Sequence, residues 1–184
     1  LWKGDVEHNG KHWQFPKATS CPKPVQEDVP IWVAARSPIT FDYAVQNNCN
    51  IMSWPLTMPF GEAEKYRDQL AEARQKFPGH TGRFAMMRHT AIYENEDDRA
   101  ASISAIRNVL GQFGNLMMKR GDVVNGFPDP IPLEELEGNV RVDPQMLEEN
   151  LMFGSPEQVV EKLKMYQDLG VDAFIYYASM GLDM

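Results

Sequence analysis

The sequence has 184 residues, of which 43% are hydrophobic and 24% are charged. These proportions are typical of a globular domain and exclude a disordered chain. No apolar run is long enough to cross a bilayer, and Leu1–Gly4 does not open a secretory leader, so we expect a cytoplasmic protein. The net charge of −8 and the scattered basic residues argue against nucleic acid or an anionic membrane as a partner and favour a small-molecule ligand.

The cysteines and histidines do not have the spacing of a metal site. His8 and His12 are four residues apart, but Gly10 lies between them in an expected turn, so the helical metal-pair pattern does not apply. Cys21 and Cys49 form no disulfide framework, and we expect both to be reduced. We therefore expect no metal.

Residues 1–30 contain many glycines and prolines and predict a connecting loop and hairpin. The apolar run Ile31–Ala35 then predicts a strand buried on both faces of a parallel sheet. A helix should follow, with Phe41, Ala44 and Val45 on its inner face. Cys49–Trp54 predicts a second strand. The helix expected over Glu62–Phe77 has one apolar stripe, made of Ala63, Tyr66, Leu70, Ala73 and Phe77.

Phe84–Tyr93 predicts a third strand, and the acidic run Glu94–Asp98 indicates a helix start, where carboxylates favour the helix dipole. The buried face of this helix is predicted to consist of Ile103, Ile106, Leu110, Phe113 and Met117. The neighbours Arg88 and His89 on the third strand could approach a substrate if they lie near its carboxyl end. We expect instead that one faces a helix and the other makes a satisfied core contact. Residues 31–119 therefore form a series of βα units.

Residues 120–152 are interrupted by glycine and proline and predict a lid-like insertion. Residues 153–184 carry the last helix and strand. Ser155 and Gln158 predict a capping box, Pro156 fits the first helical position, and Gly170 ends the helix before a strand at 173–177.

Strand and helix alternate about four times, which predicts a single α/β domain with a parallel sheet. The chain does not begin with Met and stops after its last strand, without a helix to cover it. We therefore expect an eight-stranded (β/α)8 barrel that is truncated at both ends, with open edges and exposed apolar faces.

Several segments, in order, resemble the bacterial luciferase-like flavin-dependent monooxygenases. They are Gly10–Trp13, Pro22–Gln26, Ile31–Thr40, Cys49–Trp54, Gly154–Val160 and Gly170–Asp172. The resemblance implies that the chain is the C-terminal half of a TIM barrel. It also implies an enzyme that uses reduced FMN and dioxygen to oxygenate a small organic substrate. A separate flavin reductase would supply the FMN, and members of the family commonly form homodimers.

The resemblance assigns the flavin phosphate to Ala35, Arg36, Ser37 and Thr40, and the flavin ring or substrate cavity to Trp54. The family's catalytic residues lie mostly in the N-terminal half, so no catalytic residue is named. The residues themselves support the phosphate assignment, because Ser37 and Thr40 occupy the first turn of a helix, where free backbone N–H groups attract anions. Arg36 adds a charge-assisted contact, although bacterial luciferase has an acidic residue there.

Each assignment has an alternative. Ser37 and Thr40 fit ordinary helix caps, Arg36 fits a structural ion pair, and Trp54 fits a core aromatic under a loop. Two further functions also fit the whole sequence. One is a deazaflavin-dependent hydride-transfer oxidoreductase of the same superfamily, and the other is a flavin-binding protein without turnover.

Overall fold

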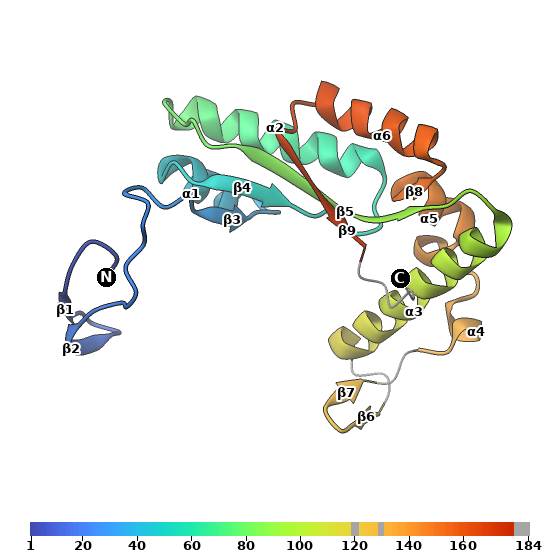
Figure 1. The fold of residues 1–184 in the computed structure, drawn as a ribbon, viewed down its shortest axis with the longest axis horizontal. Coiled ribbons are helices and arrows are strands. Elements are labelled where there is room, and N and C mark those ends of the chain that lie inside the picture. Colours follow the sequence, from blue (N-terminus) through green and yellow to red (C-terminus); the bar gives the residue numbers. More distant parts are fainter. Residues whose placement is uncertain (119–121, 129–130, 179–184) are drawn as a thin grey trace. The chain divides into compact units, whose positions relative to one another are not determined.

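The computed structural model describes residues 1–118, 122–128 and 131–178 (Figure 1). The chain divides into two compact units, Leu1–Ile31 and Trp32–Met184. In the first unit, strands β1 (Val6–Asn9) and β2 (Gln14–Ala18) pair as an antiparallel hairpin.

The second unit is built on a five-stranded parallel sheet. Its strands are β3 (Trp32–Ala34), β4 (Asn50–Ser53), β5 (Phe84–Ile92), β8 (Met152–Gly154) and β9 (Ala173–Tyr177). The order is β3-β4-β5, and β5 pairs with β9 along residues 85–89 and with β8 along residues 90–92. All of these pairs are parallel, which confirms the predicted α/β class.

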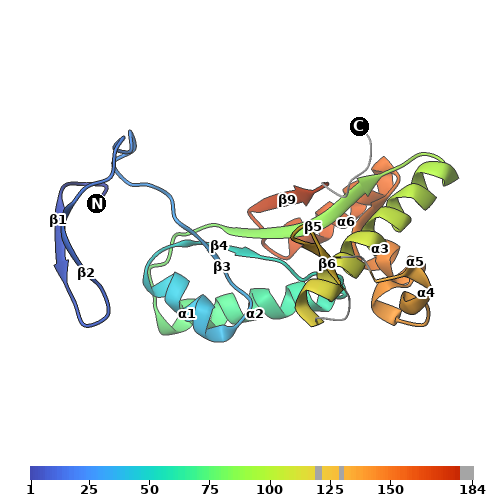
Figure 2. The same cartoon turned by 90° about the horizontal axis from the view of Figure 1, so that it is seen from below.

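Helices cover one face of this sheet. Figure 2 shows α1 (Pro38–Gln46) and α2 (Phe60–Lys76) lying against it, and α6 (Pro156–Asp168) packs into the same core. The predicted inner face of α1 is confirmed, and so is the stripe of α2, with Phe77 partly buried at its end. The helix-facing side chains of the sheet include Val33, Ile51, Phe84, Met86 and Phe174.

The opposite face of β3 is exposed, so the prediction of a strand buried on both faces is wrong. Trp32 is 39% exposed and Ala34 is also exposed. The reason is that, within the part of the chain that the structure describes, the helices cover only the Val33 side of β3, and this edge strand pairs only with β4. This exposed apolar surface matches the open face expected of a partial barrel.

The predicted buried face of α3 (Glu96–Met118) is correct only over its first half. Ile103 and Ile106 are buried, but Phe113 is 40% exposed and Met117 is 63% exposed. In the second half, the small residues Gly111 and Gly114 come close to Ile131, and Asn115 is buried beside them. In the second half of α3, the buried side is therefore the one where Gly111 and Gly114 let the backbone near Ile131 approach closely. The side that carries Phe113 and Met117 is exposed.

The segment from 122 to 154 contains short elements that the sequence did not predict. They are β6 (Val123–Val124), β7 (Phe127–Pro128), α4 (Leu133–Leu136), a 3-10 turn (Val140–Val142), α5 (Pro144–Asn150) and β8. Residues 119–121 and 129–130, part of the lid-like insertion or its border, lie outside the described residues.

Two basic side chains anchor α5. The Arg99 guanidinium donates to both carboxylate oxygens of Glu148, at 2.6 and 2.7 Å, and this contact lowers the pKa of Glu148. Lys162 of α6 donates to the carbonyl oxygens of Leu151 and Phe153, at 2.8 and 2.9 Å, and to that of Glu148. These carbonyls lie at the end of α5 and just beyond it, where a cation is favourable.

The predicted capping box of α6 is confirmed. The Ser155 hydroxyl accepts from the Gln158 amide, and the Gln158 side chain accepts from the Ser155 amide at 2.8 Å. Gly170, at a φ of +87°, ends the helix as predicted. No helix among the described residues is both long and apolar enough to cross a membrane.

Replacing Ser155 with Ala should lower the free energy of unfolding by about 1 kcal/mol, because the first turn of α6 loses its side-chain acceptor. Urea denaturation measures this change. Ser104→Ala, at an exposed serine inside α3, is the matched control and should change stability by less than about 0.5 kcal/mol. Equal effects of the two substitutions would contradict a role for the cap.

Candidate functional site

The carboxyl ends of β3, β4, β5 and β9 lie along one edge of the sheet, because these strands are parallel neighbours. In α/β barrels, this edge carries the active site on the loops that follow the strands. The predicted site residues 35–40 and Trp54 follow β3 and β4 directly. The structure therefore brings them to the same edge.

The start of α1 presents two adjacent hydroxyl groups. Ser37 has extended backbone angles and Pro38 begins the helix. The Ser37 side chain makes no cap hydrogen bond, and its Oγ lies 3.0 Å from Thr40 Oγ1. Ser37 is exposed and Thr40 is partly buried. Ser37 therefore occupies the N-cap position of α1, but its hydroxyl does not cap a backbone amide. The pair of hydroxyls remains available to a ligand.

The other helices that follow strands of the sheet begin differently. Carboxylates occupy their first turns: Glu62 in α2, Glu96, Asp97 and Asp98 in α3, and Glu157 in α6. A carboxylate there repels an anion, and in α6 the capping box already satisfies the serine. The first turn of α1 has no acidic residue. Among these four helices, α1 is therefore the best suited to bind a phosphate.

Arg36 and Ala35 support this turn from the strand side. Arg36 is exposed, and its Nε donates to the Tyr66 hydroxyl at 3.3 Å, with no ion pair to any described residue. Burial raises the pKa of Tyr66. Ala35 is fully buried; its N–H donates to the Met52 carbonyl, and its own carbonyl accepts from the Ser53 hydroxyl at 2.8 Å. Ala35 therefore fixes the end of β3, while Arg36 leaves most of its guanidinium free for a ligand.

Trp54 belongs to a cluster of three aromatic rings, in which Trp54 follows β4, His89 lies in the second half of β5 and Tyr177 ends β9. His89 stacks on Tyr177, with ring centroids 4.5 Å apart and planes 22° apart. Trp54 meets both rings edge-on, at 5.6 Å from His89 and 5.9 Å from Tyr177. From the sequence, His89 is only an alternative candidate for a substrate contact, and Tyr177 is not singled out; their positions toward the carboxyl ends of neighbouring strands are the signal that could have found them.

Two ring nitrogens in this cluster are buried without a hydrogen-bond partner among the described residues: Trp54 Nε1 and His89 Nδ1. The expectation that one of Arg88 and His89 makes a satisfied core contact is therefore wrong for His89. An unpaired buried polar group costs about 1–3 kcal/mol. Such atoms at a sheet edge where ligands bind are candidates for ligand contacts.

Arg88 faces the helices, as expected for one of the two neighbours. It is fully buried; its guanidinium donates to the Tyr166 hydroxyl at 2.8 Å and to the carbonyls of Leu56 and Met58 at 3.0 and 2.8 Å. Leu56 has a φ of +58°, a conformation rarely adopted by residues with a side chain. Arg88 therefore holds the loop that follows Trp54 in a strained turn.

Burial lowers the pKa of His89 to about 4, with a smaller contribution from the neighbouring Arg88 charge. In the unfolded chain, the His89 imidazole therefore takes up a proton near pH 6.5. In the folded chain, it takes up this proton only near pH 4. As the pH falls through this interval, His89 should lower the free energy of unfolding by up to about 1.4 kcal/mol per pH unit.

Urea denaturation from pH 7.5 to 4.5, comparing the native protein with His89→Phe, isolates this effect. The variant should lose less stability than the native protein on acidification. Parallel curves for the two proteins would contradict a neutral buried His89.

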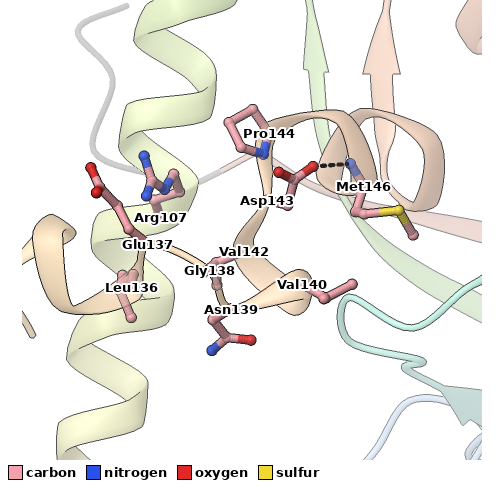
Figure 3. Close-up of a pocket in the computed structure, with 10 residues that line it drawn as sticks. All are labelled: Arg107, Leu136, Glu137, Gly138, Asn139, Val140, Val142, Asp143, Pro144 and Met146. Atoms are coloured by element: carbon pink, nitrogen blue, oxygen red, sulfur yellow. Dashed lines mark hydrogen bonds between the residues drawn. The ribbon is translucent and has the colours of Figure 1, made fainter.

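A pocket of about 490 Å³ lies away from these residues. It is lined by Arg107 of α3 and by residues from Leu136 to Met146, and Figure 3 shows Asp143 turned to the amide of Met146. The Arg107 Nε is buried without a partner among the described residues, but Glu137 and Asp143 also line the pocket. None of the predicted site residues reaches it, so it is not the site indicated by the sequence.

This arrangement of parallel strands and covering helices is half of a (β/α)8 barrel, with candidate binding residues at the carboxyl edge. The family model of the luciferase-like monooxygenases matches residues 1–173. The chain therefore belongs to the luciferase-like monooxygenase family, which confirms the resemblance.

Individual relatives agree with this assignment. The oxygenase component of the flavin-dependent trigonelline monooxygenase of Acinetobacter baylyi is 34% identical over 99% of the chain and 51% of that protein. The F420-dependent glucose-6-phosphate dehydrogenase of Segniliparus rotundus is 25% identical over 97% of the chain and 51% of that protein. The chain thus spans about half the length of these relatives.

A solved F420-dependent secondary alcohol dehydrogenase has the same fold. It superposes with a TM-score of 0.66 at 16% identity, over 96% of the chain and 51% of that structure. The agreement over half of the solved chain confirms a partial barrel.

Proposed function

We propose that this chain belongs to a flavin-dependent monooxygenase that uses reduced FMN and dioxygen to oxygenate a small organic substrate. The observation that carries the proposal is the start of α1, where the Ser37 and Thr40 hydroxyls lie 3.0 Å apart without a carboxylate in the first turn. The similarity to a flavin-dependent oxygenase component supports the choice of FMN. When bound, reduced FMN supplies the electrons that activate dioxygen.

The residues of this turn fit a phosphate monoester. Pro38 has no N–H and the Thr40 amide donates to the Ser37 carbonyl at 3.0 Å, so the donors at this turn are the two hydroxyls and the Ile39 amide. The exposed Arg36 guanidinium adds a positive charge. Ala35 contributes by fixing the strand end from which the turn departs. Trp54, at the end of the neighbouring strand β4, would line the space for the flavin ring or the substrate.

The remaining parts of the chain would shape the site. In this proposal the βα units of residues 31–119 and the last helix and strand of residues 153–184 form the barrel wall. The insertion of residues 120–152 would act as a lid that excludes water, and residues 1–30 would connect to the preceding part of the barrel. A separate flavin reductase would supply the cofactor, since the similar relative is an oxygenase component. We also propose a cytoplasmic location and a homodimer.

A deazaflavin-dependent hydride-transfer enzyme is the second candidate. Its support is the similarity to an F420-dependent dehydrogenase at 25% identity over almost the whole chain. Deazaflavin F420 also carries a phosphate, so the start of α1 fits both cofactors. Comparing the affinities of the full-length protein for FMN and for F420 separates them, because the native cofactor should bind more tightly.

The Ser37→Ala, Thr40→Ala double variant tests the phosphate site. In the full-length protein, the double variant should bind FMN about 10- to 100-fold more weakly, because each hydrogen bond to a charged group contributes about 1.5–3 kcal/mol and water replaces part of it. Riboflavin has the same ring but no phosphate, so its affinity should remain unchanged. Fluorescence quenching measures both affinities.

Ser104→Ala serves as the control, since this serine is exposed on α3. If the double variant binds FMN as tightly as the native protein does, the phosphate lies elsewhere. Equal losses for FMN and riboflavin would indicate a distorted fold rather than a lost phosphate contact, and would also count against the assignment.

A further inference from the structure

The aromatic cluster of Trp54, His89 and Tyr177 has properties that a purely structural core does not need. Trp54 and Tyr177 are partly exposed, whereas His89 is only 2% exposed. Trp54 Nε1 and His89 Nδ1 are buried and have no partner among the described residues. An indole N–H can only donate, so the atom that completes this site must be an acceptor such as a carbonyl or carboxylate oxygen.

Strand geometry places this cluster on the face opposite the helices. Phe84, Met86 and Arg88 of β5 point toward the helices, so the alternating residue His89 points to the other side. In the β5-β9 ladder, His89 is paired with Tyr177, which brings their rings together on that face. This is the inner face of the partial barrel, at the carboxyl edge where barrel enzymes bind ligands.

The stacking of Tyr177 on His89 shows that the His89 ring accepts a flat partner. Tyr177 is the last residue of β9, and its hydroxyl makes no hydrogen bond to another described residue. The Tyr177 ring can therefore move aside at a smaller cost than a ring fixed at both ends. His89 is held more firmly, because it lies inside β5, which pairs with β9 up to residue 89 and with β8 from residue 90 onward.

We propose that Trp54, His89 and Tyr177 form a subsite for a planar ring that carries a carbonyl or carboxylate oxygen. The ring stacks on His89 in the place now taken by Tyr177, and its oxygen accepts a hydrogen bond from the Trp54 indole N–H. This inference rests on the proposed function only for the source of the ring, which is either the flavin or an aromatic substrate bound beside it. His89 supplies a neutral surface, because burial and the Arg88 charge disfavour its protonation.

Isothermal titration calorimetry on the full-length protein tests the subsite with two probes, riboflavin and benzoate. Trp54→Phe keeps an aromatic ring but removes the N–H group, so it should weaken the probe that occupies the subsite about tenfold. Tyr177→Ala should leave that affinity unchanged or increase it, because the competing ring is gone. Cyclohexanecarboxylate, which is not planar, should bind more weakly than benzoate if benzoate is the occupant.

Trp13→Phe is the matched control, since Trp13 is 76% exposed and lies outside the cluster. A loss for riboflavin alone identifies the flavin as the occupant, and a loss for benzoate alone identifies the substrate. His89→Phe keeps the stacking surface but removes both ring nitrogens, and it provides the same test if Trp54→Phe does not fold.

If Trp54→Phe and His89→Phe bind both probes as the Trp13→Phe control does, the subsite is wrong, whatever the result at Ser37 and Thr40. The absence of binding of either probe to the native protein would also overturn it. The two proposals can also fail separately. If the protein binds benzoate in a way that depends on Trp54 but binds no FMN, the subsite is supported and the proposed function is contradicted.

Discussion

The parallel pairing of β5 with its neighbours determines most of this structure. β4 pairs with residues 84–86 of β5, and β9 pairs with residues 85–89, so the central strand fixes the register of both. The alternation of side chains along β5 then separates two functions. Phe84, Met86 and Arg88 support the helices, whereas His89 projects to the inner face beside Trp54 and Tyr177. A shift of one residue in this ladder would exchange these roles.

The same edge of the sheet holds two kinds of binding surface. After β3, the start of α1 presents hydroxyls and backbone amides, which suit an anion. After β4, in the second half of β5 and at the end of β9, the rings present flat apolar surfaces with two nitrogens that have no partner among the described residues. A phosphate attached to a planar ring system combines the chemistry that both surfaces select. This combination is the physical basis for the proposal of a flavin cofactor.

Much of this could be predicted from the sequence because the local signals are strong. The capping box at Ser155 and Gln158 and the apolar stripe of α2 depend on neighbours in the chain, and both are confirmed. The failures depend on tertiary contacts. Phe113 and Met117 are exposed because Gly111 and Gly114 allow Ile131 to approach another face of α3. The roles of His89 and Tyr177 follow from strand register, which single-sequence patterns do not specify.

The most direct measurement is a crystal structure of the full-length protein with FMN bound, which locates the phosphate. We predict that its oxygens lie within hydrogen-bond distance of Ser37 Oγ and Thr40 Oγ1, at the first turn of α1. A phosphate bound at the start of α6, beside Ser155, with no ligand atom near Ser37 and Thr40, would contradict the account.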